Sequence, residues 1–329
     1  MPRSYVDFAR PTFREYRWLE TSWFSAWTET GMRLHFWTGF RTNLGVATTK
    51  VFAVSTVADT LLDMDYCDQQ YHIPYGDDTR LSDYSLWSGI SVKGRPAPKK
   101  WDLAYRSPDG RLTADLEISA LMAPVEISWS EVAGAGEGFV GFHKSAGSSL
   151  PDSRAGQEPT GHVDQTVRVV GHVVIDGETQ AVDCVAQRDH SWSPRAEFRH
   201  APGNFDQVHF GEDLTLLTMV TQRADGSPDP THAYVLRDNK PRRVREISVR
   251  YHREGFKTRR VEYDVTDETG ERYELVGEQY ASMEIDMGPN IYVVFDQLRF
   301  QWEGREGLGE TQWHHEVMKL QRERRAARR

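Results

Sequence analysis

The chain has 329 residues, a formal net charge of −9 at neutral pH and a sequence pI near 5.8. Hydrophobic residues make up 38% of it and aromatic residues 11%, which excludes a disordered protein. The negative charge argues against nucleic acid as a partner. No apolar run approaches the roughly 18 residues that a membrane-spanning helix needs. The ten Trp and 13 Tyr suit strands and apolar pockets with a polar rim.

The N-terminal segment carries charged residues from Asp7 to Arg17, which does not fit a signal peptide. Cys67 and Cys184 lie far apart in the sequence and form no Cys-x-x-Cys motif, as is typical of a reduced protein. The sequence therefore predicts a cytoplasmic protein, and it leaves a homodimer open.

Alternating apolar and polar residues dominate the chain, and helical periodicity is scarce. Leu19–Trp27 fits a short helix after a turn at Pro11, and the segment Glu310–Arg325 fits one that ends in a second helix. Alternation predicts strands at Met32–Trp37, Leu44–Val54, Thr113–Ile118, Leu214–Val220, Ala233–Leu236, Arg243–Tyr251, Arg259–Val265, Arg272–Gly277 and Tyr292–Phe300. Their regular spacing predicts an all-β protein of antiparallel barrels or sandwiches with few short helices.

A stretch rich in Ser, Gly and Pro divides the chain into nearly equal halves. We expect an N-terminal β-barrel domain at residues 1–145, a linker at 146–161, a C-terminal β-barrel domain at 162–317 and a basic tail at 318–329. Basic residues crowd that tail, and a solvated terminus is the simplest interpretation.

A β-hairpin signature follows the linker. Apolar residues at alternate positions from Val167 to Ile175 share one face of a strand, and Asp176-Gly177 then forms a tight turn. The second strand ends in the run Arg188-Asp-His-Ser-Trp-Ser-Pro-Arg195. A strand that ends in titratable and basic side chains can hold a proton donor over a pocket.

Asp189 and His190 are the candidate catalytic residues of this run. Because side chains alternate along a strand, the two lie on opposite faces, and we expect one of them to face inward. Arg188 and Arg195 either hold Asp189 ionised or bind a substrate carboxylate. The alternative is a salt-bridged strand end that caps a barrel and has no chemical role.

The hairpin motifs resemble a known family. His162-Val-Asp-Gln165, Arg188-Asp-His-Ser-Trp192 and Gly307-Leu-Gly-Glu-Thr-Gln-Trp313 are similar to the lipocalin-like superfamily of AttH proteins and hydroxyneurosporene synthase (carotenoid 1,2-hydratase). Bacterial members carry the Arg-Asp-His-Ser-Trp signature. Ser193 stands here where Gly is usual, and Gln312 where Glu is usual. The resemblance implies two calycin-type β-barrels packed side by side, with a pocket for a small molecule.

Hydration of an alkene, one activity in related folds, needs a proton donor in an apolar pocket and aromatic faces that stabilise a cation. Trp192, Trp37 and Trp313 are candidate pocket walls. His162 and Gln165 lie on the partner strand, where they can approach the signature across the hairpin. Glu310 is a reserve acid, although we expect it to be solvated at the surface.

No cofactor or metal is expected. The acidic residues between Asp63 and Asp78 lack the spacing of a calcium loop, and His314-His315-Glu316 lacks the spacing of a zinc protease. The leading hypothesis is a cofactor-independent enzyme acting on a terpenoid, steroid or polyketide-like molecule by hydration, dehydration, isomerisation or cyclisation. A non-catalytic carrier of a hydrophobic ligand is the alternative, and a structural or partner-binding β protein is the third hypothesis.

Overall fold

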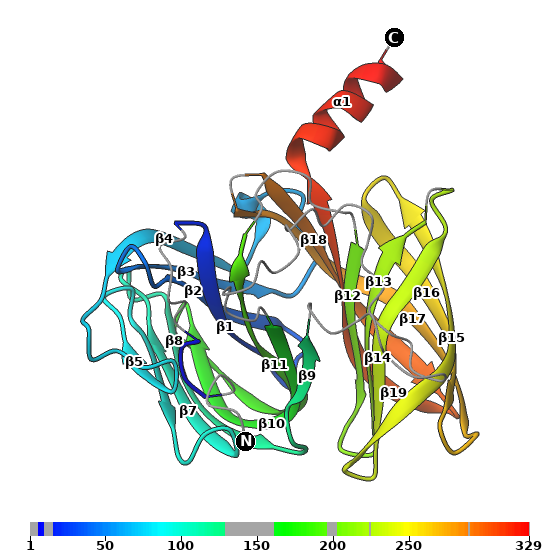
Figure 1. The fold of residues 1–329 in the computed structure, drawn as a ribbon, viewed down its shortest axis with the longest axis horizontal. Helices are drawn as coiled ribbons and strands as arrows, with labels where there is room; N and C mark the ends of the chain where they lie inside the picture. Colours follow the sequence, from blue (N-terminus) through cyan, green and yellow to red (C-terminus); the bar gives the residue numbers. More distant parts are fainter. Residues whose placement is uncertain are drawn as a thin grey trace, which may run out of the picture. The chain divides into compact units, whose positions relative to one another are not determined.

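The structure, a computed structural model, describes residues 6–9, 16–128, 161–195, 203–223, 225–288 and 290–328. These residues form two compact β units, which confirms the predicted all-β fold class (Figure 1). The first unit holds the described residues 6–9, 16–54, 65–128 and 161–195, and the second holds those of 55–64 and 203–328.

A single antiparallel sheet forms the first unit. Its strands are β1 (Trp18–Trp27), β2 (Arg33–Arg41), β3 (Val46–Val54), β4 (Tyr66–Pro74), β5 (Asp83–Ser85), β6 (Ile90–Gly94), β7 (Lys100–Arg106), β8 (Leu112–Ala120), β9 (Val125–Ser128), β10 (Gly161–Ile175) and β11 (Glu178–Pro194). They follow the order β4-β3-β2-β1-β11-β10-β8-β7-β6-β5, and β9 pairs with β10. Edge-on aromatic pairs fill the core, with Phe24 against Trp101 and Phe36 against Tyr105.

The helix expected at Leu19–Trp27 is wrong, because this segment is strand β1. It pairs with β2 on one side and with β11 on the other, and every residue but Leu19 is buried. Burial on both faces puts apolar residues at adjacent positions, so periodicity alone does not separate such a strand from a buried helix.

The predicted hairpin is present as β10 and β11. Asp176 and Gly177 have φ of +50° and +85°, as a tight primed turn requires, and Ile175 pairs with Glu178. The hairpin does not follow the expected division at 146–161, because β10 pairs with β8 and β11 pairs with β1. Sheet hydrogen bonds therefore place residues 161–195 in the first unit, while the linker itself lies almost wholly outside the described residues.

A closed antiparallel barrel forms the second unit. Its strands are β12 (Gly203–Phe210), β13 (Leu214–Gln222), β14 (Pro228–Arg237), β15 (Lys240–Glu254), β16 (Lys257–Asp267), β17 (Arg272–Gly288), β18 (Ile291–Trp302) and β19 (Arg305–Glu316). Residues 55–64, which contain the 3-10 helix η2 (Leu61–Asp63), join this unit through a parallel bridge between Val57 and Ser282.

Helix α1 (Val317–Ala327) follows β19 directly. The segment Glu310–Arg325 therefore ends in a helix, as expected, and its first part is strand because the residues up to Glu316 pair with β18. Most of the expected basic tail is helical, with Arg322, Arg324 and Arg325 exposed.

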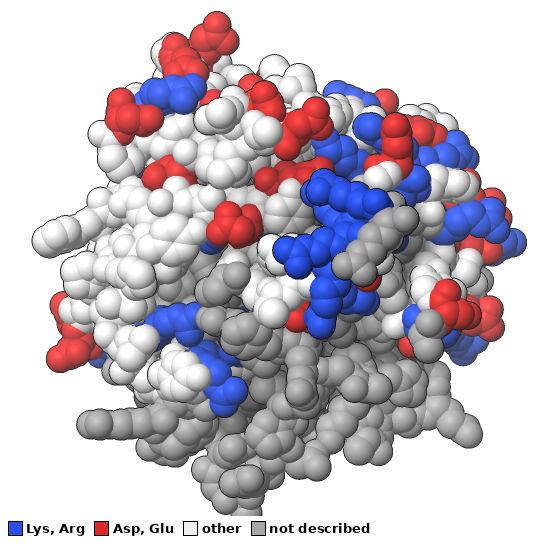
Figure 2. Space-filling model, turned by 90° about the horizontal axis from the view of Figure 1, so that it is seen from above, with Lys and Arg blue, Asp and Glu red and all other residues white. Residues whose placement is uncertain are grey.

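Figure 2 shows Lys and Arg side chains gathered on one face with Asp and Glu side chains close by. Within the described residues, no helix has the length and apolarity to cross a membrane.

Close strand packing explains the Gly-x-Gly motif in β19. A Cβ atom on Gly309 would lie 2.5 Å from the Gln207 carbonyl oxygen and 2.5 Å from the Phe300 ring. Gly307 is confined in the same way, since its Cβ would lie 2.5 Å from the His209 carbonyl oxygen. These glycines allow β12, β18 and β19 to pack against one another in the barrel wall.

We expect Gly309→Ala to destabilise the barrel by about 1–3 kcal/mol, the usual cost of overpacking. Gly288→Ala is the matched control, because its Cβ would meet nothing closer than 3.7 Å. Thermal unfolding followed by circular dichroism measures both variants. Equal melting temperatures for the two variants would contradict this account of the motif.

Candidate functional site

The signature strand β11 presents two different faces. It lies between β1 and β10, where Asp189 pairs with Trp23 and with Asp164 (Figure 1). Paired residues of antiparallel strands share a face, so these three side chains lie on one side of the sheet. Arg188 and His190 lie on the other side, as alternation along the strand predicts.

Three titratable side chains meet on the Asp189 face. His162 Nε2 lies 3.0 Å from Asp164 Oδ1, and both residues are buried. Asp189 is half-buried directly across the hairpin from Asp164. Among the described residues, Asp164 Oδ2 and Asp189 Oδ1 are buried without a hydrogen-bond partner. We call His162, Asp164 and Asp189 the acidic cluster.

Burial raises the pKa of Asp189 to about 6, and the neighbouring Asp164 charge acts in the same direction. The positive charges of His162 and Arg195 oppose this shift without cancelling it. Burial alone would lower the pKa of His162, but the charge and hydrogen bond of Asp164 outweigh it and raise that pKa. Asp164 therefore favours the protonated form of the His162 imidazole, which lies beside a carboxyl group with a pKa of about 6.

His190 is in a different environment on the opposite face. Its ring stacks on Trp192 at 4.8 Å, and its Nδ1 lies 2.6 Å from the Thr21 carbonyl oxygen. Because that carbonyl only accepts, Nδ1 carries the proton and donates it. Burial lowers the pKa of His190 to about 3, so the imidazole is neutral at physiological pH.

Arg188 shares the His190 face. Its Nε donates to Gln165 Oε1 at 2.7 Å, and its guanidinium lies 5.0 Å from the Trp101 ring centre. Gln165 in turn donates to the Met122 carbonyl oxygen at 2.8 Å. Burial lowers the pKa of Arg188 to about 10, and Asp189 acts on it only as a nearby charge.

Arg195 lies on the side of the acidic cluster. Its Nη2 donates to Ser191 Oγ, and that hydroxyl lies 2.8 Å from Thr21 Oγ1. Burial lowers the pKa of Arg195, while the charge of Asp189 works against that shift. Arg195 is thus placed to favour the ionised form of Asp189. This is one of the two roles that the sequence suggested for Arg188 and Arg195.

The remaining predicted site residues fall into two groups. Trp37 is half-buried on β2 and pairs with Trp23, so it shares the face of Asp189. Trp313 and Glu310 lie on β19, in the second unit. Glu310 is fully buried and accepts from the amides of Gln207, Gln297 and Gln312, at 3.1, 2.6 and 2.7 Å. The solvated surface position expected for Glu310 is therefore wrong.

Asp164 is the member of the cluster that sequence reasoning missed, although the signal was present. In a two-residue hairpin with its turn at 176–177, Ile175 pairs with Glu178, and the register counts back to Asp164 opposite Asp189. Trp23 was also missed, because the segment that contains it was expected to be a helix.

The acidic cluster also has donor atoms of the types that bind divalent cations. One nitrogen of His162 and one oxygen each of Asp164 and Asp189 lie within 4.8 Å of one another. Two features oppose a cation there: Asp164 favours a proton on His162, and Arg195 places positive charge near Asp189.

Comparisons with known proteins define the family and the fold. A family model described as a domain of unknown function, DUF7064, matches residues 8–317. No curated protein matches the chain. A solved structure named as an AttH from Nitrosomonas europaea is 14% identical, with a TM-score of 0.56 over 90% of this chain and 91% of that chain. CghA, solved with Sch210972, is 14% identical, with a TM-score of 0.52 over 91% of this chain and 88% of that chain.

At these identities the likeness to the solved structures shows the fold alone. It agrees with the fold that the hairpin motif implied. The chain thus belongs to the DUF7064 family and has an AttH-like fold of the lipocalin type.

Proposed function

We propose that the protein is a cofactor-independent enzyme that acts on a hydrophobic small molecule by acid–base chemistry, with Asp189 as the proton-transferring group. The observation that carries this proposal is the half-buried Asp189 beside the His162–Asp164 pair, with its pKa near 6. A group whose pKa lies close to the working pH is both an effective acid and an effective base. Strong pKa perturbation by burial and neighbouring charge is also typical of functional sites.

Hydration of an alkene illustrates the chemistry. The protonated Asp189 carboxyl gives its proton to one alkene carbon, which forms a C–H bond and leaves a cation on the other carbon. Water adds its oxygen to that cation and then loses a proton, which returns to the Asp189 carboxylate. Dehydration is the reverse, and protonation followed by loss of a different proton isomerises the double bond.

The surroundings of Asp189 fit both of its protonation states. Asp164 disfavours a second negative charge, whereas His162 and Arg195 stabilise the carboxylate that remains after proton transfer. Trp37 lies half-buried on the same sheet face, two strands away from Asp189, and offers an aromatic face to a developing cation. His190 is neutral, so in this proposal it does not supply the acid.

We expect Asp189→Asn to lower turnover by about 10²–10⁴-fold, the usual contribution of a general acid or base. The substrate is first sought by native mass spectrometry of protein from its own host, with extraction and identification of any bound molecule. That molecule is then incubated with wild type and variants, and the products are followed by mass. Asp183→Asn is the matched control, because Asp183 lies exposed on the same strand and pairs with Arg168. A ligand that is recovered unchanged, and that both variants bind like wild type, would indicate a carrier instead.

The raised pKa of Asp189 also predicts a pH-dependent effect on stability. A carboxyl group whose pKa is higher in the folded state stabilises the fold when it is protonated, and this contribution is lost as the pH rises towards 6. Asp189→Asn imitates the protonated form. We expect it to stabilise the protein by about 1–3 kcal/mol at pH 8 and to have little effect at pH 4. Chemical denaturation at the two pH values measures this difference, and equal effects at both would place the Asp189 pKa in its ordinary range.

A further inference from the structure

The interior of the C-terminal barrel is divided into an apolar end and a polar end. Asn204, Asp206, Val208 and Phe210 alternate along β12 and share one face. Val208 and Phe210 belong to the apolar core of the barrel, so Asp206 and Asn204 also face its interior. Burial of a carboxyl group in a barrel is costly unless hydrogen bonds or a function compensate for it.

Asp206 is only partly satisfied by the protein. It is 1% exposed, and its Oδ2 accepts from the hydroxyl of Tyr251 and, at 2.8 Å, from that of Tyr263. Its Oδ1 is buried, and no described residue donates a hydrogen bond of good geometry to it, although the Asn204 side chain lies close enough to favour the ionised form. Asp296, a second buried carboxyl of the barrel, differs, because Thr258 N and Gln279 Nε2 donate to its two oxygens at 2.6 and 2.7 Å. Burial raises the pKa of both carboxyl groups to about 7, so the state of Oδ1 is what distinguishes Asp206 from Asp296.

A guanidinium adjoins this carboxyl group. Arg253 lies 3.6 Å from the ring centre of Trp313 and 4.4 Å from that of Tyr251, and it donates to Asn204 Oδ1 at 3.0 Å. Its Nε is buried, and no described residue accepts from it. An arginine that is held on two aromatic rings and retains an unused donor is well placed to bind an anionic oxygen.

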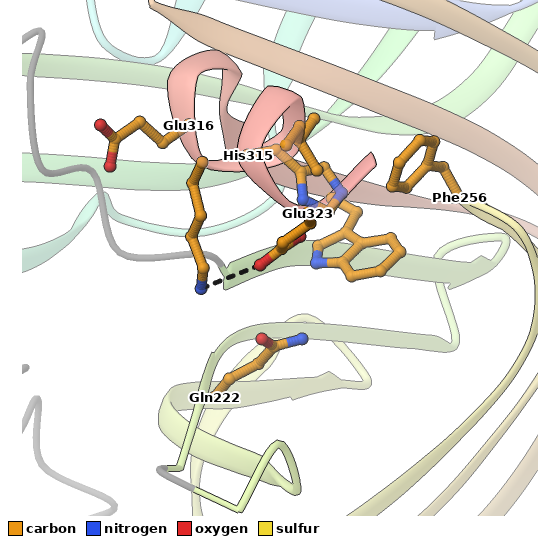
Figure 3. A pocket seen from close by; sticks show the side chains of 8 residues that line it. Gln222, Phe256, His315, Glu316 and Glu323 are labelled. Carbon is orange, nitrogen blue, oxygen red and sulfur yellow. Dashed lines mark ion pairs between the residues drawn. The ribbon is translucent and has the colours of Figure 1, made fainter. Parts of the chain in front are cut away.

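Trp313, against whose ring Arg253 lies, also lines a pocket. The pocket has a volume of about 90 Å³ and lies between the barrel and α1 (Figure 3). Phe256 and His315 provide aromatic lining, and Lys319, Leu320 and Glu323 contribute from the helix. An apolar cavity of about 150 Å³ holds benzene, so this smaller pocket has room for only part of an aromatic ring.

We propose that the polar end of the C-terminal barrel is a second ligand site, which binds the carboxylate end of a small aromatic or unsaturated acid. Arg253 and Asn204 bind the carboxylate, while Trp313 and Phe256 contact the apolar part. Asp206 tunes this site, because its negative charge opposes an anion and its protonated form does not. The site is independent of Asp189, which lies in the first unit.

Benzoate is the probe, and benzamide is its uncharged control of the same shape. We expect titration calorimetry at pH 6 to give at least about tenfold tighter binding of benzoate than of benzamide, because Arg253 favours the negative charge. Arg253→Gln should weaken benzoate binding by at least about tenfold. Arg250→Gln is the matched control on the same strand, since Arg250 is 74% exposed and pairs with Glu262. At pH 8, where Asp206 is ionised, Asp206→Asn should tighten benzoate binding, which a merely structural role for Asp206 would not do.

Leu320→Trp provides a test that leaves the barrel interior intact, because Leu320 lies on α1 and lines the pocket. The larger side chain should block benzoate binding. This variant therefore still tests the proposed site if Arg253→Gln does not fold. Equal binding of benzoate and benzamide, or benzoate binding that Arg253→Gln and Leu320→Trp leave unchanged, would overturn this second site. Asp189→Asn should bind benzoate like wild type, so failure here is separate from failure of the proposed enzyme function.

Discussion

The register of the β10–β11 hairpin is the constraint on which the candidate site depends. Positive φ at Asp176 and Gly177 closes a two-residue turn, and every later pair follows in step to Gly161 opposite Trp192. Asp164 therefore lies opposite Asp189, on the face that also holds His162. A slip by one residue would move Asp189 to the other face of the sheet, away from His162 and Asp164. Gly161 supports the register at its far end, since a Cβ atom there would lie 2.4 Å from the Trp192 ring.

The buried carboxyl groups of the protein differ in what compensates for their burial. At Asp267, burial opposes ionisation, but hydrogen bonds from Thr269, Arg242 and Tyr273 outweigh it and lower the pKa. Such a group is an ordinary structural carboxylate. Asp189 and Asp206 each keep one buried oxygen to which no described residue donates a hydrogen bond of good geometry, and burial raises the pKa of both. Groups whose burial is not compensated by the fold are the ones that we assign to proton transfer or ligand binding.

The fold alone does not select a reaction, because folds of this kind support different functions. The environment of particular atoms therefore decides which chemistry the protein can perform. In the first unit the same strand gives Asp189 a pKa near 6 and His190 a pKa near 3. Both shifts have the same main cause, because burial favours the neutral form of each group and therefore raises the pKa of the carboxyl and lowers that of the imidazole.

The sequence by itself determined the strand class, the hairpin and its register, since these follow from local alternation and from the turn residues Asp176 and Gly177. It also determined that Asp189 and His190 lie on opposite faces. The tertiary structure decided that Leu19–Trp27 is a central strand and that the hairpin belongs to the first unit, because both depend on pairing with distant strands. It alone decided the burial of Glu310, the pKa of Asp189 and the meeting of Asp206 with Arg253, because desolvation and cross-strand charge arise only when distant segments pack together.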